Sequence, residues 1–594
     1  MFRETVRGHA DRPAVRFKRR KEPDFVSYTY REFDERIQAF RRGLDALGLQ
    51  KGDRVALTSH ENRVEWAITD LAAQSLGLVT VPIYGTLPAA QVAYYINDSN
   101  ARAFVVSDSK QRAKVAEFRD QAPDLEFLIS MDGTPDQLEP EGWMAFKTVE
   151  QRGESGRSIA ELDEVASGIN PDDVATLIYT SGTTGDPKGA MLSHVNLLHT
   201  PDAVVNEPIA ELTDRDTFLS FLPLSHITER VGGHYLPLRV GACIHYSQGL
   251  SSFFEELTET VKPDMLLCVP RLWENMYSRF LEGIAKLPDK ERGPAEWGLK
   301  IGTEVAQLKS EGKGVGAMLK VQHAMADKTV LAKIREKVTG GKLRYCVSGG
   351  APLDPAAATF FLAIGIQILE GYGLSETAII AVNRPNRQRI GTVGTLMPEV
   401  EVKFAEDGEI LSRGPGRMIG YWNKPEATAE AIDGDGWFYT GDVGEMSPDG
   451  YLKITDRKKD LIVLTNGKKV APQPIEALLK HSPYIGEAVL LGDKQATVNA
   501  LLVPAFDKLK AWAKENAVAA EDDAALAAAP EVQKLYKAEI DRCAPDLADY
   551  EKIKRFKLVD KPFTVDGGEL TPTLKVKRKF VLQKYADLIA SISR

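Results

Sequence analysis

Residues 180–189, TSGTTGDPKG, limit what this chain can fold into more than any other stretch of its sequence. They include three glycines, four hydroxyl side chains, one proline and one lysine. Glycines let backbone N–H groups turn toward an anion, and the hydroxyls and Lys188 add hydrogen bonds and positive charge. The apolar run 177–179 before them predicts a buried strand, and Ser193 after them can cap a helix. The pattern therefore predicts a strand, a phosphate-binding loop and a helix rather than a plain surface turn.

A P-loop is the nearest alternative, because it also binds nucleotide phosphates through glycines and a lysine. Its pattern, G-x-x-x-x-G-K-[ST], requires Gly before the lysine and Ser or Thr after it. Here Pro187 precedes Lys188 and Gly189 follows it. We therefore expect the loop to bind ATP phosphates within a different fold.

The composition is typical of a soluble globular protein with several domains. The 594 residues are too many for one core and predict about two to four domains. The net charge of −9 argues against a general nucleic-acid binder. The four cysteines lie far apart in the sequence without a CxxC pair, which favours a reduced, cytoplasmic compartment.

No apolar run is long enough to cross a membrane, and residues 1–4 start no signal-peptide pattern. We therefore expect any membrane contact to be peripheral, at the inner membrane face. The basic cluster at residues 16–21 could touch an anionic membrane surface, but a solvated face is the favoured interpretation. A homodimer also stays open.

The first third of the chain alternates between predicted strands and helices. Strands are expected at residues 54–58, 79–82 and 103–107, with helices at 61–76 and from Pro88 between them. This alternation predicts crossover units and a mostly parallel sheet, which is an α/β fold.

Thr29 and Glu32 predict a capping box and a helix that ends at Gly48. Later in the chain, residues 291–337 predict a helical segment.

Three further stretches follow predicted strands, where α/β sheets bind ligands. His226 lies just beyond a strand that we expect to end at Pro223. Residues 349–351, GGA, follow another strand, and their glycines would permit the close approach of a flat ring. Residues 371–377, GYGLSET, follow a third: they offer an aromatic face for adenine, a serine hydroxyl for a phosphate and the Glu376 carboxylate for Mg²⁺.

The C-terminal part adds charged candidates. Asp442 follows a glycine turn and suits two ribose hydroxyls, and Arg457 and Lys459 lie where the composition changes. Further on, Asn466 and Gly467 predict a hairpin turn between two short strands, and residues 487–491 and 500–504 predict paired strands. The basic run 575–579 would by itself be a solvated or membrane-facing patch. None of these residues is specific for a function when it is taken alone.

Taken in order, these motifs resemble those of the adenylate-forming superfamily, which includes acyl-CoA synthetases, firefly luciferase and the adenylation domains of peptide synthetases. Five motifs occur in the family order across nearly the whole chain. The strings VPRLWE (269–274), DRKKDLIV (456–463) and LTPTLKVKR (570–578) resemble the long-chain fatty acyl-CoA synthetase branch. The resemblance implies a large N-terminal domain of layered sheets and helices, residues 1–458, and a small mobile α+β lid, residues 459–594.

The resemblance also implies residue roles. It assigns ATP phosphate binding to Thr180, Ser181, Gly182, Thr183, Thr184, Gly185, Lys188 and Ser375. It assigns adenine and ribose binding to Gly349, Gly350, Ala351, Gly371, Tyr372, Gly373, Asp442 and Arg457. It assigns catalysis to Lys575, Glu376 and His226, metal binding to Glu376 and the hinge to Lys459. Lys577 is the alternative to Lys575, because Leu574 stands where many relatives have Gly.

The implied reaction joins a long-chain fatty acid to coenzyme A with ATP and Mg²⁺. The fatty acid carboxylate is a poor electrophile, so it first attacks the α-phosphate of ATP to give an acyl-adenylate and pyrophosphate. AMP then leaves when a thiolate attacks. Two alternatives stay open. The first is a fatty acyl-AMP ligase or acyl-carrier-protein ligase with another acceptor, and the second is a non-catalytic binding protein on the same fold.

Overall fold

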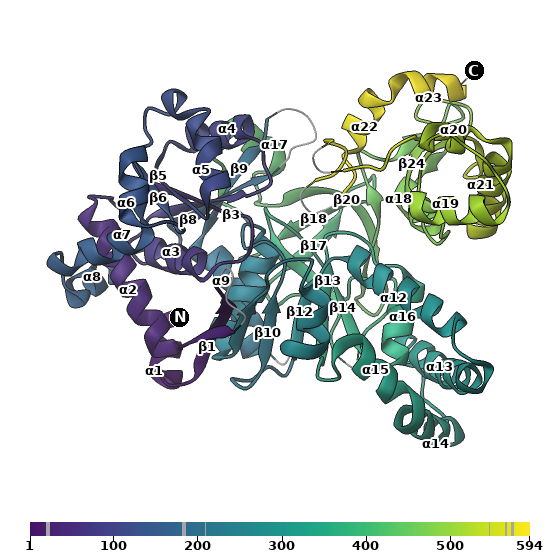
Figure 1. Ribbon diagram of the computed structural model, residues 1–594, viewed down its shortest axis with the longest axis horizontal. Helices are drawn as coiled ribbons and strands as arrows, with labels where there is room; N and C mark the ends of the chain where they lie inside the picture. Colours follow the sequence, from purple (N-terminus) through teal and green to yellow (C-terminus); the bar gives the residue numbers. More distant parts are fainter. Residues whose placement is uncertain are drawn as a thin grey trace. The chain divides into compact units, whose positions relative to one another are not determined.

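The computed structural model describes residues 1–19, 24–180, 186–207, 209–385, 387–545, 547–564, 567–571 and 575–593. The chain forms two compact units. Unit 1 consists of Met1–Lys403, Leu411–Thr440 and Met446–Lys453, and unit 2 consists of Phe404–Ile410, Gly441–Glu445 and Ile454–Arg594. The predicted α/β class, with a large N-terminal part and a small C-terminal part, is confirmed (Figure 1). The boundary at 458/459 and the mobility of the lid stay predictions.

An eight-stranded sheet carries the phosphate loop in unit 1. Its order is β19-β9-β8-β4-β3-β5-β6-β7, and the neighbouring pairs from β8 to β7 are parallel. The strands are β3 (Arg54–Ser59), β4 (Val79–Tyr84), β5 (Ala101–Val106), β6 (Phe127–Ser130), β7 (Met144–Ala145), β8 (Val174–Thr180), β9 (Lys188–Ser193) and β19 (Gly420–Tyr421). The alternation predicted from residue 54 onward is therefore confirmed.

A nine-stranded sheet, also in unit 1, has the order β16-β15-β14-β13-β12-β10-β11-β1-β2. Its central strands are parallel and its edge strands β15, β16 and β2 are antiparallel to their neighbours. The strands are β1 (Pro13–Lys18), β2 (Phe25–Thr29), β10 (Thr217–Ser220), β11 (Cys243–Tyr246), β12 (Met265–Cys268), β13 (Tyr345–Gly349), β14 (Gln367–Leu374), β15 (Ala378–Val382) and β16 (Thr395–Leu396).

Helices cover these sheets because their apolar faces match the buried strands. The helix predicted after Thr29 is α2 (Tyr30–Ala46), and Thr29 and Glu32 form the predicted capping box. Phe40 of α2 stacks on Phe146 with ring centroids 4.1 Å apart, inside the core that also contains Leu57 and Val105. Strands buried on both faces are apolar nearly throughout, as parallel sheets require.

The other helices of unit 1 follow the same rule. They are α1 (Phe2–His9), α3 (Val64–Gln74), α4 (Ala89–Ser99), α5 (Ser109–Ala116), α6 (Pro135–Leu138), α7 (Phe146–Arg152), α8 (Ile159–Ser167), α9 (His194–Asn206), α10 (Leu236–Val240), α11 (Phe253–Glu255), α12 (Pro270–Ala285), α13 (Asp289–Ser310), α14 (Ala317–Ala326), α15 (Ala332–Thr339), α16 (Pro355–Ala363) and α17 (Pro425–Ala431). Figure 1 shows α13, α14 and α15 gathered beyond α12 and α16. The helical segment predicted for residues 291–337 is therefore confirmed.

A four-stranded sheet has the order β17-β18-β20-β21. Its strands are β17 (Glu401–Phe404), β18 (Glu409–Arg413), β20 (Phe438–Met446) and β21 (Leu452–Arg457). The interpretation of Asp442 as a residue after a turn is wrong, because the strand continues through it. Gly441 has φ of +71° inside β20, so the glycine bends the strand without ending it.

Unit 2 contains a three-stranded sheet, β24 (Ile485–Leu491), β25 (Val498–Pro504) and β26 (Ile553–Leu558). The strands predicted around 487–491 and 500–504 pair antiparallel, and the hairpin predicted at Asn466 joins β22 (Ile462–Val463) to β23 (Lys469–Val470). The helices are α18 (Pro472–Leu479), α19 (Phe506–Glu515), α20 (Asp523–Ala528), α21 (Pro530–Cys543), α22 (Arg578–Lys584) and α23 (Ala586–Ser593).

Two local expectations are wrong. Ser193 caps helix α9 as predicted, but a strand, β9, lies between the phosphate loop and that helix, so the expected passage from loop directly to helix is wrong. The segment forms a strand because it pairs antiparallel with β8 on one edge and with β19 on the other. The strand expected to end at Pro223 is shorter and ends at Ser220. Among the described residues, no helix is both long and apolar enough to span a membrane.

Candidate active site

The phosphate loop is closed by a pair of strand residues. Thr180 is the last residue of β8 and Lys188 is the first residue of β9, and the two are direct partners in the antiparallel ladder. The predicted ligands Ser181, Gly182, Thr183, Thr184 and Gly185 lie outside the described residues. The structure therefore fixes both ends of the predicted loop side by side.

Glu376 lies beside the mouth of this loop. It occupies the turn between β14 and β15, and only 8 % of its surface is exposed. Its Oε1 accepts a hydrogen bond from the Thr180 hydroxyl at 3.0 Å and another from the Tyr421 hydroxyl at 3.2 Å. The backbone N–H of Met418 donates to its carbonyl oxygen at 2.7 Å. The structure thus brings together the predicted metal ligand and the predicted phosphate loop, 196 residues apart in sequence.

Tyr421 is a residue of this cluster that sequence reasoning missed. It belongs to β19, which pairs with β9, and the Lys188 ammonium lies 5.1 Å from the centre of its ring. Burial and the nearby Glu376 carboxylate raise the pKa of Tyr421 above its usual value, so the hydroxyl keeps its proton and donates. The only sequence signal was a pair of aromatic residues after Gly420.

The predicted adenine ligands meet at neighbouring strand ends. Gly349 of β13 pairs with Gly371 of β14, and a Cβ on Gly349 would come within 3.1 Å of the Gly371 carbonyl oxygen. Position 373 also requires a glycine, because a Cβ there would collide with the Ala378 carbonyl. The GYG segment therefore continues strand β14 instead of forming the loop after it. The carboxyl ends of parallel strands are where such sheets bind ligands.

The other predicted residues of this edge are accessible. Gly350 and Ala351 are exposed just after β13, and Tyr372 and Ser375 are half-buried. Glu370, which sequence reasoning treated only as part of a strand, is buried in β14. Burial raises the pKa of Glu370 to about 7, partly offset by backbone N–H donors that include Leu353. Burial at this strand therefore favours the neutral form of the Glu370 carboxyl group.

His226 is half-buried beyond β10, where the sequence placed it. Its backbone N–H donates to the Pro223 carbonyl at 2.8 Å, and its Nδ1 accepts from the Thr228 N–H at 3.2 Å. In the neutral imidazole this arrangement leaves the ring proton on Nε2. His226 lies three residues before a π-helix, Glu229–Tyr235. Such helices are rare and often occur at functional sites.

The π-helix supplies two buried charged side chains. Arg230 donates to both carboxylate oxygens of Asp70, and both residues are fully buried. It also donates to Thr176 at 2.8 Å and to Thr80 at 2.7 Å, which ties β8 and β4 together. Glu229 is fully buried, and desolvation raises its pKa to about 8 although Ser220 and the Leu222 N–H oppose the shift. Sequence reasoning assigned no role to any of these groups.

The predicted ribose ligands meet in unit 2. Asp442 is 3 % exposed in β20, and the Nε atom of Arg457 lies 3.0 Å from its Oδ1 atom. Beside them, the Glu409 carboxylate accepts from the Gly441 N–H at 2.9 Å and from the Lys458 ammonium at 2.7 Å. These contacts hold the segment directly before the predicted hinge residue Lys459.

Lys575 is in the same charged neighbourhood of unit 2. Its N–H donates to the Thr571 hydroxyl at 3.0 Å, and the Thr571 N–H donates back to its carbonyl at 2.8 Å. The residue is exposed, yet desolvation of the ammonium and the nearby Arg457 guanidinium lower the pKa of Lys575 below its usual value, with Asp442 opposing them. The alternative, Lys577, donates its N–H to the Glu569 carbonyl at 2.7 Å.

The Glu376 carboxylate fits a magnesium ion whose other ligands come mainly from substrate phosphates and water. Among the described residues, no group of three or more His, Cys, Asp or Glu side chains is placed to hold a metal. Mg²⁺ usually takes one or two protein carboxylates and completes its shell with water and phosphate oxygens. A single buried carboxylate at the mouth of a phosphate loop matches that requirement.

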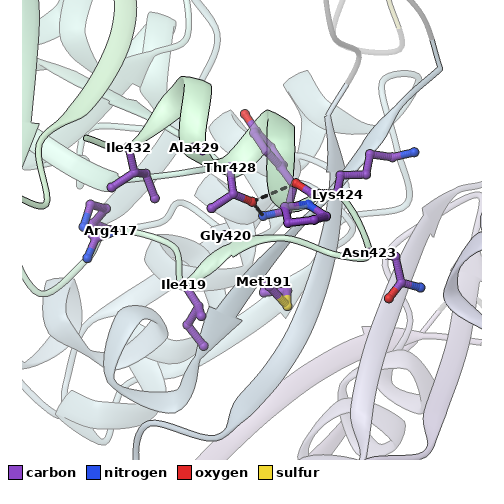
Figure 2. Close-up of a pocket in the computed structure, with 11 residues that line it drawn as sticks. Met191, Arg417, Ile419, Gly420, Asn423, Lys424, Thr428, Ala429 and Ile432 are labelled. Carbon is purple, nitrogen blue, oxygen red and sulfur yellow. Dashed lines mark hydrogen bonds between the residues drawn. The ribbon is translucent and has the colours of Figure 1, made fainter. Parts of the chain in front are cut away.

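A pocket of about 470 Å³ is lined by residues of β19, α17 and the segments beside them (Figure 2). The Thr428 hydroxyl accepts from the Tyr421 N–H at 2.8 Å and donates to the Lys424 carbonyl at 3.0 Å. None of the predicted site residues lines this pocket; its walls are Met191, Arg417, Ile419, Gly420, Tyr421, Asn423, Lys424, Pro425, Thr428, Ala429 and Ile432. The contacts around Glu376, and not this pocket, therefore define the candidate site.

Comparisons with known proteins cover the whole chain. The model of the AMP-binding enzyme family matches residues 2–422, and that of the AMP-binding enzyme C-terminal domain matches residues 459–593. The chain is 36 % identical to the long-chain-fatty-acid–CoA ligase FadD15 of Mycobacterium bovis, over 99 % of this chain and 98 % of that protein. It is 30 % identical to the long-chain-fatty-acid–CoA ligase ACSBG2 of Xenopus laevis, over 100 % of this chain and 83 % of that protein.

A solved structure shares the fold. The adenylation domain of a carboxylate reductase from Mycobacterium chelonae superposes with a TM-score of 0.77 at 24 % identity, covering 99 % of this chain and 90 % of that one. The α/β fold that the resemblance implies, with a large N-terminal and a small C-terminal part, is therefore confirmed.

Proposed function

Because this chain belongs to the AMP-binding enzyme family, we propose that it is an AMP-forming long-chain fatty acid–CoA ligase. Its substrates are a long-chain fatty acid, ATP and coenzyme A. The observation that carries the proposal is the contact of Glu376 with Thr180 at the mouth of the phosphate loop. The full-length similarity to proteins named as long-chain fatty acid–CoA ligases supports the choice of substrate.

In the first step, the fatty acid carboxylate attacks the α-phosphate of ATP and pyrophosphate leaves. The N–H and hydroxyl groups of residues 180–185, together with Lys188, hold the β- and γ-phosphates, and Ser375 contributes a further hydroxyl. Glu376 would hold Mg²⁺, which would supply positive charge against the phosphate oxygens. Thr180 and Tyr421 orient this carboxylate, because both donate to the same oxygen.

Two further residues act at the reacting groups. His226, whose ring proton is on Nε2 when the imidazole is neutral, is assigned to orient the fatty acid carboxylate. Lys575 neutralises the charge that builds at the α-phosphate during attack. The resemblance assigns the adenine to the strand-end residues around Gly349 and Tyr372, and the ribose to Asp442 and Arg457. The ion pair between the last two supports their assignment to one ligand.

In the second step, the thiolate of coenzyme A attacks the acyl-adenylate and AMP leaves. We propose that residues 459–594 form a lid that pivots at Lys459 between the two steps. The start of the C-terminal family match at residue 459 supports this boundary. The contacts that fix Lys458 to Glu409 support a pivot that begins directly after it.

The alternative is a ligase that leaves the acyl-adenylate as product or passes the acyl group to a carrier protein. The retained set Glu376, Asp442, Arg457 and Lys575 argues against a non-catalytic protein. We place the enzyme in the cytoplasm on the basis of its cysteines, all four of which are free thiols in the structure.

The test is pyrophosphate release over a panel of carboxylic acids, with and without coenzyme A and Mg²⁺. The proposal expects turnover to rise from acetate to acids of about twelve to eighteen carbons, because each buried CH₂ contributes ~0.8 kcal/mol. It also expects multiple turnovers only with coenzyme A. Best turnover with acetate, benzoate or an amino acid would contradict the substrate, and full turnover without coenzyme A would favour the alternative.

A further inference from the structure

An apolar stripe lies on the outer face of α14 in unit 1. Met318, Val321 and Met325 are 73 %, 68 % and 58 % exposed, and they are three of the four most exposed large hydrophobic side chains among the described residues. Their spacing of three and then four residues puts them on one face of the helix. Exposed hydrophobic residues scattered singly need no explanation, but three in a row on one face do.

The face of α14 away from the stripe packs against the rest of unit 1. Ala326 is fully buried, and Leu319 packs on the same hydrophobic core. The exposed stripe is therefore not needed to hold the helix in place. Figure 1 shows α14 at the outer end of the group formed with α13 and α15. The stripe is therefore exposed to solvent on the outermost helix of this group.

The charged residues around the stripe are mainly basic, although the whole chain has a net charge of −9. Residues 311–335 contain four lysines and Arg335 against two acidic residues, Glu311 and Asp327, a sum of +3. Glu311 is paired with Lys313, whose Nζ lies 2.6 Å from its Oε2. Asp327 is engaged by Arg335, whose Nη1 lies 3.1 Å from its Oδ1. The lysines, which are all exposed, are Lys313, Lys320, Lys328 and Lys333.

We propose that this face of α14 docks on the surface of an anionic lipid bilayer. Met318, Val321 and Met325 enter the boundary between head groups and acyl chains, and the flanking lysines contact lipid phosphates. A second copy of this face is the weaker occupant, since it would bring like charges together. The proposal draws on the proposed function in one respect: a long-chain fatty acid partitions into bilayers, so docking places the enzyme at its substrate.

The test is co-sedimentation of the full chain with vesicles. ATP and coenzyme A are left out, so membrane binding is measured independently of ligase activity. Vesicles of phosphatidylglycerol and phosphatidylcholine are compared with phosphatidylcholine alone. The triple variant Met318→Gln, Val321→Gln, Met325→Gln is expected to bind anionic vesicles at least about tenfold more weakly. A matched control, Ile159→Gln, Val205→Gln, Leu582→Gln, changes three exposed side chains elsewhere and is expected to bind like the original chain.

Lysine variants separate the two components of binding. Lys320→Gln and Lys328→Gln are each expected to weaken binding about fivefold at low salt and to have little effect at high salt. Unchanged binding of the triple apolar variant, with its melting temperature preserved, would overturn the proposal. So would an original chain that binds neither vesicle, or one that dimerises in solution through this face while the triple variant is monomeric.

Discussion

Replacing Glu376 by Gln tests the centre of the candidate site, because the structure separates the loss of charge from the loss of structure. The amide oxygen of Gln can accept the same two hydroxyl hydrogen bonds, from Thr180 at 3.0 Å and from Tyr421 at 3.2 Å. The fold should therefore keep its stability to within about 1 kcal/mol. What disappears is the negative charge at the mouth of the phosphate loop.

The expected cost in rate follows from that charge. Losing one preorganised electrostatic contact typically costs about 4 kcal/mol, which is a factor of about a thousand in the adenylation rate. Tyr421→Phe is the graded control, because it removes one of the two hydroxyl donors and keeps the carboxylate charge. It should cost about 10- to 160-fold, less than Glu376→Gln, since a hydrogen bond to a charged group contributes about 1.5–3 kcal/mol.

The assay is pyrophosphate release as a function of Mg²⁺ concentration, with thermal unfolding measured on the same samples. Glu376→Gln should need more Mg²⁺ for half-maximal rate and should stay slow at saturation. An unchanged rate at limiting Mg²⁺ would assign the metal elsewhere. A larger loss in Tyr421→Phe than in Glu376→Gln would show that the hydroxyl, and not the carboxylate, is the essential group.

Three other predictions concern the rest of the chain. Lys575→Ala should slow adenylation about a thousandfold but spare thioester formation from supplied acyl-adenylate; separate assays of the two half-reactions check this, and loss of adenylation in Lys577→Ala instead would identify the other lysine. Arg230→Leu leaves the Asp70 carboxylate buried without its cation, and should lower the free energy of unfolding of unit 1 by about 3–5 kcal/mol in urea titrations. Burial raises the pKa of Glu229 to about 8, so its contribution to folding stability is complete below its ordinary pKa of 4.5 and is lost as the pH rises toward 8. The melting temperature of Glu229→Gln should therefore fall less steeply over that pH range. If the melting temperature of the variant falls as steeply with pH as that of the original chain, the shift is refuted.

The elements that sequence reasoning placed correctly are those that local physics determines. The capping box at Thr29 and the turn at Asn466 are formed by neighbouring residues, so their patterns carry the answer. The alternation of strands and helices predicted the parallel sheet correctly, because a strand that is apolar on both faces must be covered on both faces.

What sequence reasoning missed depends on contacts between distant segments. Tyr421 reaches Glu376 only because β19 pairs with β9, and the residues next to Tyr421 contain no sequence pattern that predicts this pairing. The strand after the phosphate loop was missed for the same reason, since β9 is held by partners on both edges and not by its own residues alone. The proximity of Thr180 to Glu376 rested on resemblance, and no spacing in the sequence could have supplied it.

The position of β9 between β8 and β19 has a consequence for ligand binding. Lys188 begins this strand, and the two strands beside it carry Thr180 and Tyr421, the hydroxyls that hold Glu376. A nucleotide that engages Lys188 therefore stiffens the same ladder that orients the carboxylate, and a cation on the carboxylate stiffens the ladder that presents the lysine. The nucleotide and Mg²⁺ are thus expected to bind cooperatively, and linkage requires each to raise the affinity of the other by the same factor.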